Sequence, residues 1–147
     1  MTFASRLQQL LSAIWAGVLL AVGGVAAPSL FAVLDRSLAG LAAGRIFAIE
    51  AFVSLVLAMV LFFIERQRTR QAALQAGQSL MSTELMLVMG ALFATVLGHF
   101  AISPMIVAAK AGQGSLSFGT LHAMSSSLFL FKGVLVLALA WRLTGRR

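Results

Sequence analysis

The sequence contains no cysteine and no tyrosine, and only 4 of its 147 residues are acidic. The missing cysteines exclude disulfides, thiolate metal sites and thiol catalysis. Charged residues make up 10% of the chain, whereas a soluble domain carries about 25%. The chain therefore lacks the charged surface that a water-soluble protein of this length needs.

Apolar residues make up most of the chain instead. They account for 61% of the sequence, and the mean hydropathy is +1.00. Four apolar blocks, at about residues 10–34, 45–64, 84–109 and 118–141, are each near the roughly 20 residues that a membrane-spanning helix needs. We therefore expect one integral membrane domain over residues 1–147, an all-α, up-and-down antiparallel bundle of four transmembrane helices.

The basic residues lie between these blocks, so the net charge of +7 indicates membrane topology rather than a nucleic-acid partner. One side of the predicted bundle holds Arg6, Arg66, Arg68, Arg70, Arg142, Arg146 and Arg147. The other side holds only Arg36, Arg45 and Lys110. The positive-inside rule predicts that both termini and an Arg-rich loop at residues 65–83 are cytoplasmic, in a multi-pass protein of the bacterial inner membrane.

Prolines and small residues indicate the shape of the helices. Pro28 and Pro104 predict a bend or break near the ends of the first and third helices, because proline removes a backbone hydrogen bond. Small residues recur every four positions, which lets helices approach closely. These close-packing candidates are Gly40, Gly44, Gly90, Ala94 and Gly98.

The polar residues inside the blocks are the candidate site. At about 1.5 Å per residue, Glu50 and His122 lie roughly 7–8 Å deep from the outer side, and His99 roughly 13–15 Å deep. Ser103 shares the face of His99. We expect these side chains to share one cavity in the outer half of the bundle, with Arg45 at its mouth or paired with Glu50.

The fourth predicted helix has several polar residues close together. Its rotation of 100° per residue places His122, Ser125 and Ser126 on one inward face. Lys132 lies nearer the cytoplasmic end, where it snorkels or approaches Glu84. Each of these groups also has a purely structural interpretation, because serines bond carbonyls one turn back and a histidine can link two helices.

Catalytic and cofactor chemistry have little support. Two histidines and a glutamate can ligate a divalent ion, but no paired histidine spacing is present. The depths of His99 and His122 differ by roughly 6 Å, which disfavours haem. No oxyanion loop or orienting acid accompanies Ser125 and His122. We expect no metal, no cofactor and no enzymatic activity.

Three patches of the chain resemble the transmembrane-protein-205-like family, whose bacterial members form domain of unknown function 4149. They are residues 24–31 (GVAAPSLF), residues 39–47 around Gly40 and Gly44, and Phe118 followed by His122 and Ser125. Pro104 also matches the family pattern. The resemblance covers the whole predicted bundle and implies a four-helix integral membrane protein of uncharacterised function.

Two functional hypotheses remain open. In the first, the polar pocket binds or passes a small solute, a proton or a cation. In the second, the chain is a structural membrane subunit, in which glycine seams form interfaces and the polar residues fix helix register. The second predicts a homo-oligomer or a membrane-protein partner. The lipid bilayer surrounds the protein in both.

Overall fold

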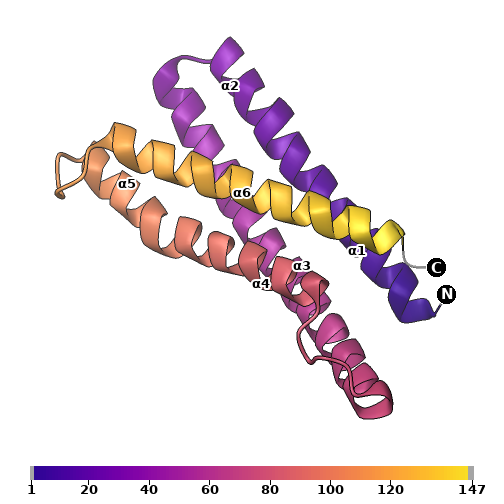
Figure 1. Cartoon of the computed structure of the whole chain (residues 1–147). Coiled ribbons are helices and arrows are strands. Elements are labelled where there is room, and N and C mark those ends of the chain that lie inside the picture. The colour runs from indigo at the N-terminus through magenta and orange to yellow at the C-terminus, as the bar shows by residue number, and fades with distance from the viewer. Residues whose placement is uncertain (1, 146–147) are drawn as a thin grey trace.

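The computed structural model describes residues 2–145, and every regular element in this range is helical. The segments α1 (Phe3–Leu20), η1 (Ala21–Ala26) and α2 (Ala27–Val33) form one continuous helix, and α3 spans Arg36–Ala76. The segments α4 (Thr83–Val96), η2 (Leu97–Ile102) and α5 (Ser103–Lys110) form the next, followed by α6 (Phe118–Thr144). Within the described residues, four helices are long and apolar enough to cross a membrane (Figure 1).

Each long helix begins at a residue whose side chain accepts a backbone N–H of the first turn. These N-caps are Thr2, Asp35, Ser82 and Ser117. The carboxylate of Asp35 accepts hydrogen bonds from the N–H groups of Ser37 and Leu38, at 3.0 and 3.1 Å. Such a cap satisfies donors that a helix leaves unpaired at its start. The sequence therefore specifies where each long helix begins.

The second long helix is longer than expected. We placed it at residues 45–64, whereas it spans Arg36–Ala76. The cap at Asp35 starts it nine residues earlier. The predicted Arg-rich loop at residues 65–83 is helical as far as Ala76, since arginine, glutamine and alanine are good helix formers. Gly77 ends the helix with a left-handed backbone (φ +62°), which glycine adopts without steric cost.

Neither proline breaks its helix. Each lies just after a π-helical turn, η1 before Pro28 and η2 before Pro104. The residue immediately before each proline donates its N–H five residues back, Ala27 to the carbonyl of Val22 and Ser103 to that of Gly98. The wider turn accommodates a residue that has no N–H to donate. Where the sequence predicted a bend or break, each helix is locally widened and its backbone continues without a break.

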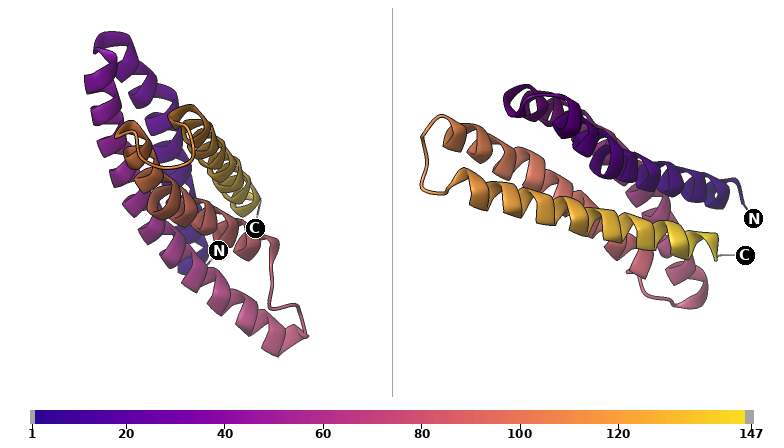
Figure 2. Two further views of the ribbon diagram at one scale, coloured as in Figure 1. Left: turned by 90° about the vertical axis from the view of Figure 1, so that its left-hand side faces the viewer. Right: turned by 90° about the horizontal axis from the view of Figure 1, so that it is seen from above.

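The four long helices are packed tightly in one half of the bundle only. The segments α1 and α4 each pack against both α3 and α6, around a core that includes Trp15, Leu61, Val88, Val136 and Leu139. Both chain termini lie at this end of the molecule (Figures 1 and 2). We call this half, which also holds Glu65 and Glu84, the closed end.

At the opposite end the helices diverge in two pairs. The segment α2 packs on α3 and α5 packs on α6, and none of the residues of α2 and α5 is buried. Figures 1 and 2 show the purple pair, α2 with the start of α3, separating from the orange pair, α5 with the start of α6, toward the turn at residues 34–35 and the connection at 111–117. We call this half the open end.

The small residues divide between the two halves. A methyl group added at Gly90 would lie 2.9 Å from Cδ1 of Leu135, and Ala94 is buried, so helices approach closely at these positions. At Gly44 and Gly98 an added methyl group would meet no atom within 4 Å, and at Gly40 it would meet only the Lys110 ammonium at 3.9 Å. These three predicted packing positions are not close contacts, because the helix pairs have already separated there.

Candidate functional site

A cavity of about 700 Å³ lies between the two helix pairs. Its lining includes six of the seven residues that the sequence singled out, namely Glu50, His99, Ser103, His122, Ser125 and Ser126. Arg45 is exposed and is not among the lining residues. Gly40, Gly44 and Gly98 also line the cavity, so the missing side chains at these positions widen it.

The floor of the cavity is a buried ion pair between Glu50 of α3 and Lys132 of α6. The Lys132 ammonium lies 2.7 and 2.9 Å from the two carboxylate oxygens of Glu50, and each residue is 4% exposed. Ser54 donates its hydroxyl to Glu50 and accepts the indole N–H of Trp15 at 2.8 Å. The chain of hydrogen bonds connects α1, α3 and α6 at one level.

This pairing corrects two expectations about depth and partners. Glu50 lies 14 residues after Arg36, and Lys132 lies 14 residues after Phe118. Both are therefore about 21 Å from the open end of their helices, much deeper than the position expected for Glu50. Lys132 neither snorkels nor approaches Glu84. It neutralises Glu50, because a buried carboxylate without a partner is costly.

Aromatic rings accompany both histidines. His99 on η2 makes edge-to-face contacts with Phe52 and Phe100, with ring centroids 5.2 and 4.9 Å apart. His122 stacks on Phe118 at 5.7 Å, near the start of α6. The two imidazoles face one cavity from α6 and from the neighbouring long helix, so the cavity has polar groups on two walls.

Ser127 shows that polarity on α6 is not confined to the cavity. Its hydroxyl donates to the carbonyl of Ala123 at 2.8 Å, and it is not among the cavity-lining residues, whereas Ser125 and Ser126 are. The structural interpretation of the three serines therefore holds for Ser127. It provides a matched comparison for Ser126 one residue away.

Lys110 is the basic residue at the mouth. Its ammonium lies 5.4 Å from the ring centroid of Phe118 and close to the backbone of Gly40 on the opposite helix pair. The side chain thus spans the gap between the two diverging pairs. Lys110 takes the position at the mouth that we expected for Arg45.

Phe129 of α6 lines the cavity beside the ion pair at its floor. Its ring makes an edge-to-face contact with Phe47 at 5.2 Å, and the Lys132 ammonium lies 5.2 Å from its centroid. A methyl group added at Gly23 would lie only 2.5 Å from the Phe129 ring, so the glycine of the π-helical turn makes room for this side chain. The ring fills the space where η1, α3 and α6 converge.

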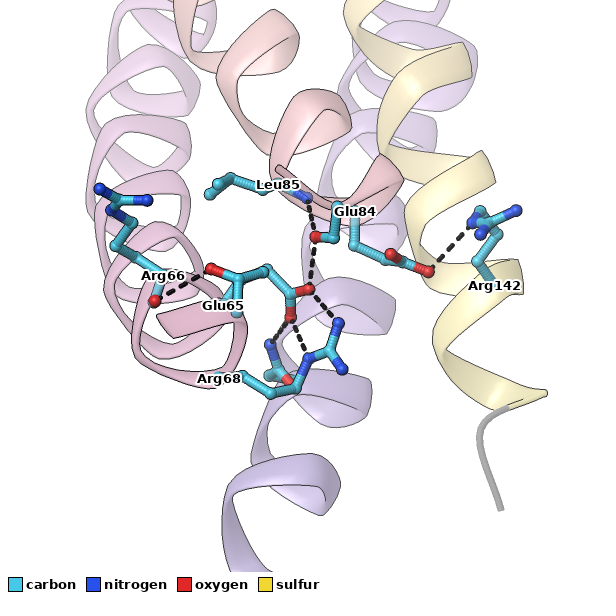
Figure 3. A network of polar contacts seen from close by, with 9 residues as sticks. Glu65, Arg66, Arg68, Glu84, Leu85 and Arg142 are labelled. Atoms are coloured by element: carbon cyan, nitrogen blue, oxygen red, sulfur yellow. Dashed lines mark hydrogen bonds and ion pairs between the residues drawn. The ribbon is translucent and has the colours of Figure 1, made fainter. Parts of the chain in front are cut away.

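The closed end has a second polar network, centred on Glu65, which is 1% exposed. Its carboxylate accepts hydrogen bonds from Gln8 of α1 at 2.8 Å, from Ser82 at 2.7 Å, and from Arg68 at 2.6 and 3.0 Å. Figure 3 shows Arg68 directed at the carboxylate of Glu65, with the pair formed by Glu84 and Arg142 (3.1 Å) nearby. Together, the Glu65 network and the Glu84–Arg142 pair link all four long helices at this end.

Sequence reasoning missed the partners of the buried carboxylates. Lys132, Ser54 and Trp15 were not placed with Glu50, although counting residues from the capping residues Asp35 and Ser117 puts Glu50 and Lys132 at equal depth. Ser54 follows Glu50 by one helical turn and thus shares its face. Every buried side-chain nitrogen or oxygen in the described part of the chain has a hydrogen-bond partner.

Comparison with known protein families shows that the model of a domain of unknown function (DUF4149) matches residues 10–115. The chain belongs to this family. No curated protein and no solved structure matches it. The DUF4149 match includes Glu50, His99 and Lys110 but ends before α6, so it does not cover the patch of Phe118, His122 and Ser125.

Proposed function

We propose that this DUF4149 protein is an integral membrane protein that binds a small solute in the cavity of the open end. Polar groups in spanning helices are costly and commonly face a cavity that serves a substrate or an ion. The described chain has four helices of spanning character, and its two histidines, three serines and buried ion pair gather along one such cavity. This arrangement supports binding over a purely structural role.

The observation that carries the proposal is the position of the Glu50–Lys132 pair. A pair that only joined two helices would be enclosed by apolar side chains, as in the core around Trp15 and Leu61. Here both residues form the floor of a 700 Å³ cavity, a volume within the range of about 300–1,000 Å³ that is typical of small-molecule sites. A solute that reaches the floor meets a fixed dipole of one ammonium and one carboxylate.

The orientation of the bundle belongs to the same proposal. Arg6, Arg66, Arg68, Arg70 and Arg142 lie at the closed end, whereas Arg36, Arg45 and Lys110 lie toward the open end. By the positive-inside rule the closed end, with both termini, faces the cytoplasm. The helices then run up and down in an antiparallel bundle across the bacterial inner membrane, and the cavity opens outward.

A bound organic solute fits the cavity better than a metal ion. Among residues 2–145, no group of three or more metal-ligating side chains is clustered, whereas structural metal sites use about four protein ligands. The lining is mostly apolar with a few convergent polar groups, which is the usual character of a small-molecule site.

Cysteine labelling tests the proposal, because the chain has no cysteine of its own. Ser126→Cys places a thiol in the cavity and Ser127→Cys places one outside it. With a water-soluble, charged thiol reagent on protein in nanodiscs, we expect Ser126→Cys to react at least about tenfold faster, because thiolates form readily only where water reaches. Equal rates at the two positions would contradict a solute-accessible cavity.

A further inference from the structure

The cavity is open on one side as well as at its mouth. Leu20 and Phe31 of the first long helix and Leu130, Val134 and Leu137 of α6 all line it. The same five residues are 43–69% exposed. A residue that lines a cavity and is also about half exposed marks the place where the cavity meets its surroundings. Around spanning helices these surroundings are hydrocarbon, so the side opening faces acyl chains.

The charges of the cavity favour an anion. Its lining contains two ammonium groups, on Lys110 and Lys132, and one carboxylate, on Glu50. That carboxylate is already bonded to Lys132 and Ser54. Lys110 forms no ion pair with a carboxylate among residues 2–145 and lies at the mouth beside Phe118. A negatively charged group at the mouth would provide the missing counter-charge.

The charged and apolar parts are ordered along the helix axis. Lys110 ends α5 at the open end, and His122 lies near the start of α6. The exposed residues Leu130, Val134 and Leu137 lie 12–19 residues after Phe118, or about 18–28 Å further along the helix. A lipid in the leaflet at the open end has the same order, with its head group at the surface and its chain directed inward.

From these observations we infer that the ligand is an amphiphile with an anionic head group and a single hydrocarbon chain, which enters from the bilayer through the side opening between α6 and the first long helix. The head group binds Lys110 at the mouth, near His122, and the chain lies along Leu130, Val134 and Leu137. This inference rests on the proposed function and specifies its ligand class.

Tryptophan fluorescence provides the test. Trp141→Phe leaves Trp15 as the only tryptophan, fully buried beside Ser54. Trp15→Phe leaves Trp141, which is 81% exposed and reports probe in the surrounding bilayer. The probe is hexadecanoate brominated at its methyl end, added to protein in zwitterionic nanodiscs. We expect saturable quenching of Trp15, reversed by unlabelled hexadecanoate and not by hexadecyltrimethylammonium, whereas quenching of Trp141 rises without saturation.

Three variants test whether the probe binds in the cavity. In the Trp141→Phe background, Lys110→Gln removes the charge at the mouth and raises the half-saturating probe concentration about three- to tenfold, the range of a partly exposed charged contact. Val134→Phe narrows the side opening and weakens quenching. Met86→Phe, a similar change at an exposed position of α4 outside the cavity, leaves quenching unchanged.

Two results would overturn the inference, and they are distinguishable from failure of the proposed function. Quenching of Trp15 that never saturates, or that is equal in Lys110→Gln, excludes an anionic amphiphile in the cavity. If Ser126→Cys is still labelled selectively, the solute site stands without this ligand class. If Ser126→Cys and Ser127→Cys react alike, the solute site is itself excluded.

Discussion

The two ends of this bundle use buried carboxylates in opposite ways. Glu65 at the closed end accepts hydrogen bonds from Gln8, Arg68 and Ser82 and is not among the residues that line the 700 Å³ cavity. Glu50 is equally buried, yet its pair with Lys132 forms the floor of the open half. The same residue type thus fixes helix packing at one end and provides a polar surface at the other. The difference lies in whether the helices beyond the carboxylate converge or diverge.

Breaking the closed end is expected to destabilise the protein strongly. Glu65→Ala removes the acceptor shared by Gln8, Ser82 and Arg68. We expect the free energy of unfolding to fall by about 3 kcal/mol, because bonds to a buried charge are worth roughly 1.5–3 kcal/mol each while the half-exposed Arg68 adds less. Unfolding experiments in mixed micelles measure this free energy. Arg70→Ala, an exposed change on the same helix, is the control, and an equal loss in both would contradict a specific role for Glu65.

A double-mutant cycle sharpens the role of Glu50. Lys132→Met leaves the buried carboxylate without its partner and is expected to destabilise the protein by about 3–5 kcal/mol. Adding Glu50→Gln restores most of that loss, because an apolar or neutral pair of similar volume can replace a buried ion pair. The double variant should fold and yet lose solute binding. If it binds as well as the parent protein, the pair is only structural.

Alanine substitutions at two glycines compare helix packing in the two halves directly, with smaller expected changes in stability. Gly90→Ala forces a methyl group against Leu135 at 2.9 Å and should cost about 1 kcal/mol, the lower end of overpacking effects. Gly44→Ala meets no atom within 4 Å and should be neutral or stabilising by up to about 1 kcal/mol, since alanine favours helix. Thermal unfolding of the two variants distinguishes them. Equal destabilisation would mean that the helices also converge near Gly44.

The smallest expected effect on stability is at His122. This residue is exposed to the cavity mouth and stacks only on Phe118. His122→Ala should change the free energy of unfolding by about 0.5 kcal/mol or less, while solute binding weakens. A large loss of stability with unchanged binding would assign His122 to packing, as the structural-subunit hypothesis requires.

Hydropathy alone predicted four helices of spanning length, because the bilayer constrains the length of any spanning segment, but it set the bounds of α3 too narrowly. The periodicity of α6 placed Ser125 and Ser126 on one face with His122, and all three line the cavity. The depth of Glu50 was wrong because the helix start was placed at Arg45, although Asp35 followed by Ser37 carries a capping signal. An error of nine residues displaced Glu50 by about 14 Å and concealed Lys132 as its partner.

Other features depend on tertiary packing that a single sequence does not contain. The four-residue spacing of Gly90, Ala94 and Gly98 is uniform, yet the helices touch at Gly90 and have separated by Gly98. Pro104 predicted a disruption but not its form, since a π-helical turn and a break relieve the same steric conflict. In both cases the outcome depends on what lies opposite, across the bundle.

The most direct test of this account is side-specific labelling of Ser126→Cys in intact membranes. A charged, membrane-impermeant thiol reagent is applied either to right-side-out spheroplasts or to inside-out vesicles, with Arg70→Cys at the Arg-rich end of α3 as the reference. We predict that Ser126→Cys reacts only from the outside and Arg70→Cys only from the cytoplasmic side. Reaction of Ser126→Cys from the cytoplasmic side, or from neither side, would contradict a cavity that opens outward.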